Sequence, residues 1–255
     1  MTSDDHVLAA ELAEQAGRRL LGLRAEGGDP DDLRKAGDRQ SHDFLAAELA
    51  ARRPGDAVLS EEGRDDPVRL SAERVWIVDP LDGTREYGEA GRTDWAVHVA
   101  LWESGALTAG AVALPAQGEV LSTAIPPVVP PGAPGLVGQK LRVVVSRTRP
   151  PAFLDRLSEL ADLILLPLGS AGAKAAAVMQ GEADVYVHAG GQYEWDSAAP
   201  VAVAVAAGLH ASRIDGSALE YNRPDPVLPD ILICPTEIAK PLLDAIGAAT
   251  AARPA

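Results

Sequence analysis

The spacing of hydrophobic and polar residues predicts an amphipathic helix near the start of the chain. Across residues 5–24 the apolar side chains recur at intervals of three and four, which places them on one face of a helix. Gly27 and Gly28 are expected to end this helix. The acidic segment 29–32 contains a proline and is typical of a mobile loop.

The pattern then changes from the helical period to the two-residue period of β-strands. Ser41 is expected to cap a second helix that ends before Pro54. Segments rich in β-branched and aromatic residues follow, with turn residues between them. The strands expected in this half of the chain are residues 57–60, 74–78, 95–101, 109–114 and 118–121.

A proline- and glycine-rich tract at residues 126–138 is the best candidate for a boundary between two subdomains, 1–138 and 139–255. After it, strand and helix patterns alternate, which indicates a sheet covered by helices. The expected strands are 141–146, 163–166, 183–188 and 230–234, and the expected helices are 151–160, 171–180, 197–207 and one after residue 234.

Composition and charge limit the classes of partner. The chain has 255 residues, 47% of them hydrophobic, which is enough for a sizeable core. Its net charge of −14 argues against binding to a nucleic acid polymer or to an anionic membrane surface. No signal peptide or transmembrane run is apparent, so the cytoplasm is the expected location. The one cysteine, Cys234, lies in an apolar run and is expected to be a buried core residue.

Two aspartates that follow a predicted strand are candidate metal ligands. Asp79 and Asp82 bracket Pro80 and Leu81, and the proline is expected to turn the chain so that the two carboxylates converge. The Leu81 carbonyl between them adds a third oxygen, and such hard oxygen ligands suit Mg²⁺. Two Mg²⁺ ions would activate water and neutralise a leaving alkoxide. Taken alone, the segment is equally compatible with a surface turn.

Other polar residues have both a functional and a plain interpretation. Glu61 follows a strand, where it is either a ligand or, with Glu62, a solvated pair. Asp196 precedes an apolar helix and is either a ligand or its N-cap. Asp38 on its own is a turn residue, and Ser170 a simple N-cap. His98 and His188 are interpreted as structural.

These motifs resemble the inositol monophosphatase superfamily of metal-dependent, lithium-sensitive phosphatases. The matching stretches are residues 59–62, 76–84 and 195–199, in the family order. Within the superfamily, the continuation 85–87 (Arg-Glu-Tyr) is similar to the CysQ branch of 3′(2′),5′-bisphosphate nucleotidases. Segments 36–40 and 190–196 are similar to its actinobacterial members in particular.

The resemblance implies a layered α-β-α-β-α sandwich with two or three Mg²⁺ ions and a homodimeric assembly. It implies hydrolysis of 3′-phosphoadenosine 5′-phosphate to AMP and phosphate, in sulfate assimilation. The alternative is an inositol monophosphatase or fructose-1,6-bisphosphatase with the same metal chemistry. A non-catalytic Mg²⁺- or nucleotide-binding regulator is a third hypothesis, which the complete acidic set disfavours.

The resemblance also assigns roles to single residues. The implied metal ligands are Glu61, Asp79, the Leu81 carbonyl, Asp82 and Asp196. The implied catalytic residues are Glu61, through its metal, and an Asp38–Thr84 pair that orients and deprotonates water. The Gly83 and Thr84 amides would hold the phosphate, Ser170 and Lys174 would receive the ribose or 5′-phosphate, and Tyr193 or Trp195 would border adenine. For these last four side chains, plain packing is an equal alternative.

Overall fold

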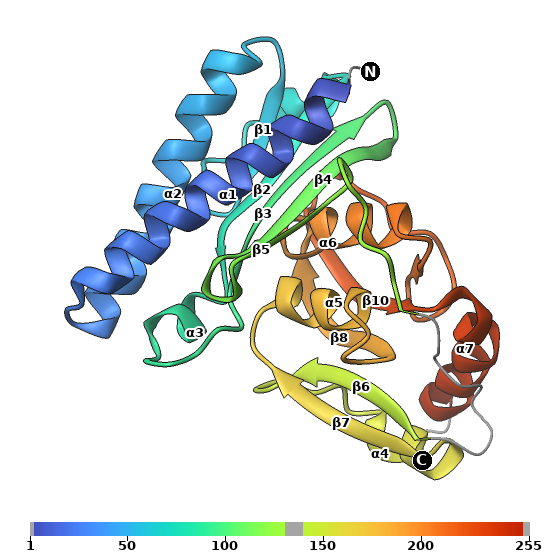
Figure 1. Ribbon diagram of the computed structural model, residues 1–255. Helices are drawn as coiled ribbons and strands as arrows, with labels where there is room; N and C mark the ends of the chain where they lie inside the picture. The colour runs from blue at the N-terminus through green and yellow to red at the C-terminus, as the bar shows by residue number, and fades with distance from the viewer. Residues whose placement is uncertain (1–2, 131–139, 252–255) are drawn as a thin grey trace.

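The computed structural model describes residues 3–130 and 140–251. Helices and sheets alternate through the molecule in the order α-β-α-β-α (Figure 1). This arrangement confirms the predicted fold class. The helices are α1 (Ser3–Glu26), α2 (Pro30–Arg52), α3 (Thr84–Gly88), α4 (Leu154–Leu160), α5 (Ala171–Met179), α6 (Glu194–Ala206) and α7 (Thr236–Ala251), with short 3-10 helices η1 (Pro67–Ser71) and η2 (Pro115–Gln117).

The helices α1 and α2 form the first layer and cover one face of the first sheet (Figure 1). The apolar face of α1, including Leu8, Leu12 and Leu20, is buried against that sheet together with Leu45 of α2. The predicted first helix is therefore confirmed.

The predicted start of the second helix is wrong. Helix α2 begins at Pro30 rather than near Ser41, because Asp29 is an N-cap whose carboxylate accepts the amides of Asp31 and Asp32 at 2.9 and 3.3 Å. A proline in the first turn and acidic residues at the positive helix end favour this start. The segment expected to be a mobile loop is therefore the first turn of a 23-residue helix.

The first sheet has the order β1-β2-β3-β4-β5. β1 runs parallel to β2, and the other neighbours are antiparallel. All five strands predicted in this half are confirmed, with β2 extending four residues further than expected. The strands are β1 (Ala57–Ser60), β2 (Arg74–Asp82), β3 (Ala96–Glu103), β4 (Ala106–Leu114) and β5 (Glu119–Ser122).

Helices α5 and α6 lie between the two sheets (Figure 1). Both are rich in alanine and valine, and their side chains join the inner faces of both sheets in one hydrophobic core. Ile77 of β2, Ala199 of α6 and Ile231 of β10 are members of this core. The two halves of the chain therefore share buried surface, while the predicted tract at residues 126–138 lies partly outside the described residues.

The second sheet has the order β7-β6-β8-β10-β9, and helices α4 and α7 cover its outer face. Its longer strands were predicted, whereas β9, with three residues, was not. Cys234 is fully buried in this outer core, as expected. The strands are β6 (Leu141–Ser146), β7 (Leu163–Leu168), β8 (Val185–Tyr193), β9 (His210–Ser212) and β10 (Val227–Cys234).

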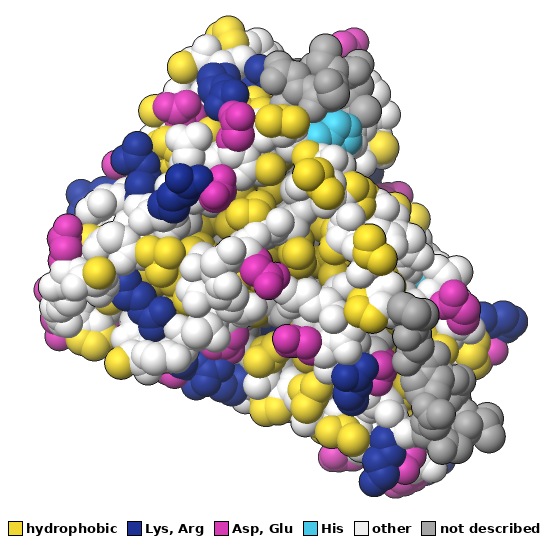
Figure 2. Space-filling view, in the orientation of Figure 1, with side chains coloured by type: hydrophobic (Ala, Val, Ile, Leu, Met, Phe, Trp, Pro, Cys, Tyr) yellow, Lys and Arg dark blue, Asp and Glu magenta, His cyan; other side chains and the backbone are white. Residues whose placement is uncertain are grey.

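The surface carries charges of both signs interspersed with each other, and hydrophobic side chains gather near the centre of one face (Figure 2). In the described part of the chain, no helix combines the length and the apolar character needed to cross a membrane.

Candidate metal centre and active site

A β-bulge brings Asp79 and Asp82 to the same face of the first sheet. Residues three apart in a regular strand point to opposite faces. Along β2, however, Asp79 pairs with His98 and Asp82 pairs with Ala96, so three steps on β2 match two on β3. The extra residue reverses the alternation, as a bulge does. The sequence predicted a turn at Pro80, but the chain continues in strand β2 there. After the bulge, the side chains of β2 alternate between the two faces in the opposite order.

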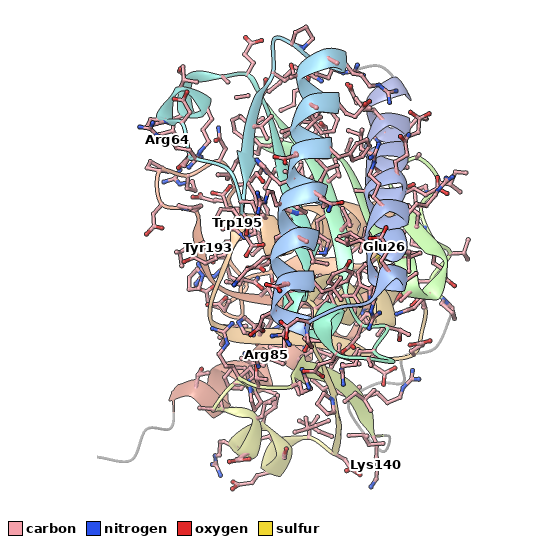
Figure 3. All side chains as sticks on the ribbon, turned by 90° about the vertical axis from the view of Figure 1, so that its left-hand side faces the viewer. Glu26, Arg64, Arg85, Lys140, Tyr193 and Trp195 are labelled. Atoms are coloured by element: carbon pink, nitrogen blue, oxygen red, sulfur yellow. The ribbon has the colours of Figure 1, made fainter. Side chains whose placement is uncertain are left out.

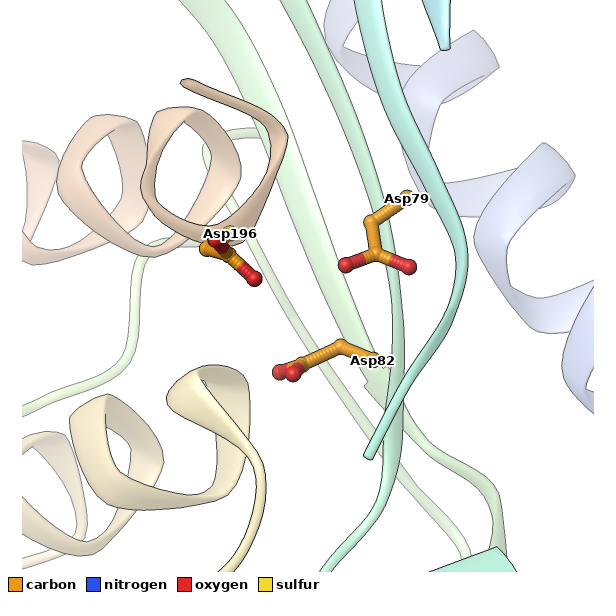
Figure 4. A group of neighbouring side chains, drawn as sticks. All are labelled: Asp79, Asp82 and Asp196. Carbon is orange, nitrogen blue, oxygen red and sulfur yellow. The ribbon is translucent and has the colours of Figure 1, made fainter. Parts of the chain in front are cut away.

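Three carboxylates from two distant segments meet at this bulge (Figure 4). Asp79, Asp82 and Asp196 each offer an oxygen, and these oxygens lie within 4.8 Å of one another. Asp196 comes from the first turn of α6, where its carboxylate accepts the Tyr193 amide at 2.6 Å. The predicted N-cap position for Asp196 is therefore wrong, because Tyr193 occupies it.

Two carboxylates of this cluster, Asp79 and Asp196, hold their protons unusually strongly, as does Glu61 beside Asp79. Burial, followed by the charge of Glu61, raises the pKa of Asp79 well above its ordinary value. Burial and then Asp82 raise the pKa of Asp196 to about 6. Burial and then Asp196 raise the pKa of Glu61 to about 7, although Glu61 as a whole residue is exposed. A divalent cation among these oxygens would relieve the repulsion between the carboxylates.

Asp82 differs from its neighbours because donors surround it. Its carboxylate accepts the Ser170 hydroxyl at 2.6 Å and the Ala171 and Gly172 amides at 3.2 and 2.6 Å. His98 lies 3.1 Å away on the other side. Burial alone would raise the pKa of Asp82, but His98, together with Lys174 and the Ser170 hydroxyl, brings that pKa below its usual value. Asp82 thus stays ionised and also anchors the start of α5.

His98 is a fully buried cation behind the cluster. Its Nδ1 lies 3.0 Å from the Trp195 carbonyl oxygen, which can only accept, so Nδ1 carries a hydrogen. A lone pair on Nε2 facing Asp82 would be repelled, so Nε2 is protonated as well. Burial opposes this charge, but Asp82 raises the pKa of His98. The contact is an ion pair by distance, without good hydrogen-bond angles.

The Asp38–Thr84 pair predicted from the sequence is present as a contact. The Thr84 hydroxyl lies 3.3 Å from Asp38 Oδ1 and 3.1 Å from the Leu81 carbonyl oxygen, and it can donate to either. Asp38 lies on α2, which closely approaches the bulge because the Ser41 hydroxyl donates to the Pro80 carbonyl at 2.7 Å. Burial and then Glu62 raise the pKa of Asp38 to about 6.

A cavity of about 230 Å³ opens beside the cluster. Of the predicted residues, Asp82, Gly83, Thr84, Lys174 and Asp196 line it. Lys174 is almost completely buried, and its ammonium group donates to the Gly169 and Ser170 carbonyls at 2.6 and 2.8 Å. Burial lowers the pKa of Lys174 despite nearby carboxylates.

Ser170 and Trp195 both have contacts within the protein. The Ser170 hydroxyl caps α5 by accepting the Ala173 amide, as its plain interpretation predicted, and it also donates to Asp82. The Trp195 ring stacks on Tyr193 with ring centroids 4.6 Å apart (Figure 3). Neither Ser170 nor Trp195 is among the residues lining the cavity, so their predicted contacts with substrate stay predictions.

Some residues of the site were not singled out from the sequence. Arg147 and Arg149, directly after β6, line the cavity. Their position at the end of a strand, in a Ser-Arg-Thr-Arg run, was the available signal. His98 was interpreted as structural, and its contact with Asp82 depends on a strand pairing that no local pattern reveals.

A second network links the two segments that carry the ligands. The Arg69 guanidinium, buried in η1, donates to the Asn222 side-chain oxygen at 2.8 Å and to the Arg223 carbonyl at 2.9 Å. The amides of Asn222 and Arg223 in turn donate to Glu194 at 2.7 and 2.8 Å. Glu194 begins α6, two residues before Asp196. Arg69 therefore connects the segment after Glu61 to the helix that carries Asp196.

The chain is similar to known proteins in sequence and in fold. The chain matches the inositol monophosphatase family over residues 6–248. It is 54% identical over 242 residues to a Mycobacterium tuberculosis protein named 3′-phosphoadenosine 5′-phosphate phosphatase, covering 91% of this chain and 89% of that one. A Mycobacterium leprae protein of the same name is 52% identical over 256 residues, covering 95% and 93%. The crystal structure of inositol monophosphatase-II from Staphylococcus aureus shares the fold, with a TM-score of 0.77 at 20% identity over 99% of both chains.

Proposed function

The chain belongs to the inositol monophosphatase family, and from this premise we propose that it is a Mg²⁺-dependent phosphomonoesterase that hydrolyses 3′-phosphoadenosine 5′-phosphate to AMP and phosphate. The names and high identity of the mycobacterial relatives support this substrate. The Arg85-Glu86-Tyr87 continuation after the metal motif supports it as well.

The observation that carries the proposal is the convergence of Asp79, Asp82 and Asp196. Only oxygen ligands are offered, which suits a hard cation such as Mg²⁺. Without a cation, two of the three carboxylates have raised pKa values because of burial and mutual repulsion. Glu61, with its raised pKa, and the Leu81 carbonyl are the further ligands in the proposal.

Bound Mg²⁺ would supply a Lewis acid that lowers the pKa of a water molecule and neutralises charge on the phosphoryl group. The protein's own part is to position that water and take its proton. The Thr84 hydroxyl accepts a proton from the water as it passes its own proton to Asp38, 3.3 Å away. The raised pKa of Asp38, about 6, suits a base that works near neutral pH.

The phosphate is held beside the bulge in this proposal. Gly83 has a left-handed φ of 85°, and a side chain there would approach the Trp95 backbone to 3.3 Å. Both the left-handed backbone and these protein atoms therefore require glycine here, at a position that lines the cavity. Lys174 and Arg147 place positive charge along the same cavity, which offsets the acidic cluster.

The test is phosphate release from 3′-phosphoadenosine 5′-phosphate, measured with Mg²⁺, with EDTA and with Mg²⁺ plus Li⁺. Release that requires Mg²⁺ and is inhibited by Li⁺ is the expected result. Fast hydrolysis of inositol 1-phosphate without release from the nucleotide would instead assign the protein to the inositol and sugar phosphatases. No hydrolysis of any phosphate ester would favour a binding protein.

The proposal also includes a homodimer, as the family resemblance implies, and the cytoplasmic location expected from the sequence. Sedimentation equilibrium would give the mass in solution, and a single 26.5 kDa species would contradict the dimer. Cell fractionation tests the location.

A further inference from the structure

A second cavity adjoins the one beside the carboxylates. It has a volume of about 600 Å³, compared with about 230 Å³ for the first. Arg149 and His188 line both cavities, so the two meet at these side chains. A ligand that reaches past Arg149 from the metal site enters the second cavity.

The wall of the second cavity is suited to a flat, apolar group. Phe153, Ala152 and Pro150 form part of it, before and at the start of α4. The lining also includes Gly190 near the end of β8, with a left-handed φ of 112°. A Cβ at Gly190 would meet no atom within 4 Å, so the backbone there faces open space. Glycine within a strand often marks such a close approach of a ligand.

Arg149 is a cation without an ion-pair partner at the junction of the cavities. Its neighbour Arg147 is held by Glu86 and Glu89 at 2.5 and 2.9 Å. In the described ranges, no carboxylate lies within ion-pair distance of the Arg149 guanidinium, and the side chain is exposed. In a chain with a net charge of −14, such a free guanidinium is available to an anionic ligand.

Building on the proposed function, we infer that the second cavity binds the base of a nucleoside bisphosphate, while Arg149 contacts the phosphate that is not hydrolysed. One ligand then satisfies three separated features: the carboxylate cluster, the free guanidinium and the apolar cavity. Inositol phosphates and fructose 1,6-bisphosphate lack an aromatic ring to bury, so this cavity distinguishes nucleotides from the other candidate substrates. Burial of the ring contributes through the apolar area removed from water.

The first test fills the cavity. Ala152 is exposed and lines only the second cavity, so Ala152→Trp blocks it without touching the carboxylates. We expect the ratio of kcat/KM for 3′-phosphoadenosine 5′-phosphate to that for inositol 1-phosphate to fall by about tenfold or more, mainly through KM for the nucleotide. The matched control is Ala50→Trp, at an exposed position of α2 away from both cavities, which should keep the wild-type ratio.

The second test removes the cation. Arg149→Ala should reduce the preference for 3′-phosphoadenosine 5′-phosphate over adenosine 3′-phosphate by about 10- to 100-fold, the value of a hydrogen bond to a charged group. The control is Arg64→Ala, an exposed arginine outside both cavities (Figure 3). Thermal unfolding of each variant checks that the fold is intact. Ala152→Trp tests the binding of the base, and Arg149→Ala separately tests the contact with the phosphate.

The outcomes separate this inference from the proposed function. If the wild type releases no phosphate from the nucleotide, the proposed function is wrong. If the wild type does so but Ala152→Trp and Arg149→Ala both keep wild-type preferences, the assignment of the second cavity is overturned and the proposed function stands. An equal fall in kcat/KM for 3′-phosphoadenosine 5′-phosphate and inositol 1-phosphate with Ala152→Trp would also overturn the assignment of the second cavity.

Discussion

His98 joins the two segments that carry the metal ligands, because its ring lies between the Asp82 carboxylate and the carbonyl oxygen of Trp195. The distances are 3.1 Å from Nε2 to Oδ2 and 3.0 Å from Nδ1 to the carbonyl oxygen. Trp195 directly precedes Asp196, so one buried imidazolium orients a ligand from β2 and the peptide unit before a ligand from α6.

Replacing His98 with leucine should destabilise the protein by about 3–5 kcal/mol, because a buried carboxylate loses its cation. Urea unfolding in EDTA measures the effect without bound metal. His98→Asn, which retains a polar side chain, should fall between wild type and His98→Leu. A change below about 1 kcal/mol for His98→Leu would show that Asp82 is stabilised by its other donors alone.

The stability gained from Mg²⁺ should depend on pH. The raised pKa values of Asp38 and Asp196, about 6, and of Glu61, about 7, mean that the folded protein binds more protons than the unfolded chain between about pH 4.5 and 7. By linkage these groups reduce stability as pH rises through that window. A cation relieves the repulsion, so the increase in Tm on adding Mg²⁺ should be larger near pH 7.5 than near pH 5. Equal increases at the two pH values would contradict this account.

Asp82→Asn should lower kcat by about 10²-fold or more, the size expected when a main electrostatic stabiliser is lost. The amide keeps the shape of the side chain and one acceptor for the start of α5, so the fold should persist. Asp43→Asn, at an exposed position on α2, is the matched control and should have wild-type kcat. If Asp82→Asn turns over substrate as fast as wild type, Asp82 is not a functional ligand.

Thr84→Val removes the hydroxyl between Asp38 and the Leu81 carbonyl while conserving shape. We expect kcat to fall by about 10²-fold with little change in KM, because general-base assistance contributes factors of this size. Thr84→Ser keeps the hydroxyl and should retain most of the activity. Equal activity of the valine and serine variants would exclude the proton path through Thr84.

Arg69→Ala should weaken Mg²⁺ activation although Arg69 lies outside the ligand set. Loss of the guanidinium leaves the Asn222 side-chain oxygen and the Arg223 carbonyl without their donor, so the support for Glu194 and Asp196 loosens. The Mg²⁺ concentration for half-maximal activity should rise about tenfold or more, as for other residues that orient ligands. Arg18→Ala, an exposed residue paired with Glu14, serves as control. If the Mg²⁺ concentration for half-maximal activity is unchanged in Arg69→Ala, Arg69 stabilises the fold but does not orient the metal ligands.

Local patterns predicted most of the fold because most elements bury one face. Helix α1 and the strands around Ile77 and Val144 follow hydrophobic periods that need no tertiary information. The start of α2 was missed because Asp29 and Pro30 favour turns and helix starts alike. β9 is too short for any period to be visible.

The sequence singled out the three carboxylates that converge, Asp79, Asp82 and Asp196, but not the residues that support them. Asp79 and Asp82 follow a strand within one short motif, so their proximity could be expected. Their common direction depends on the bulge, which is defined only by the pairing with β3. The contact of Arg69 with Asn222 joins residues 153 positions apart, and no sequence pattern in a single chain reports such a pair.

The tight fit at Gly172 has a consequence for how this site changes in evolution. A Cβ at position 172 would lie 2.2 Å from Nε2 of His98, and 2.9 Å from the Cβ of Ala96. Residues 98 and 172 are therefore not free to vary independently. A side chain at position 172 would need space from both neighbours, so relatives that have one should carry a smaller residue at position 98.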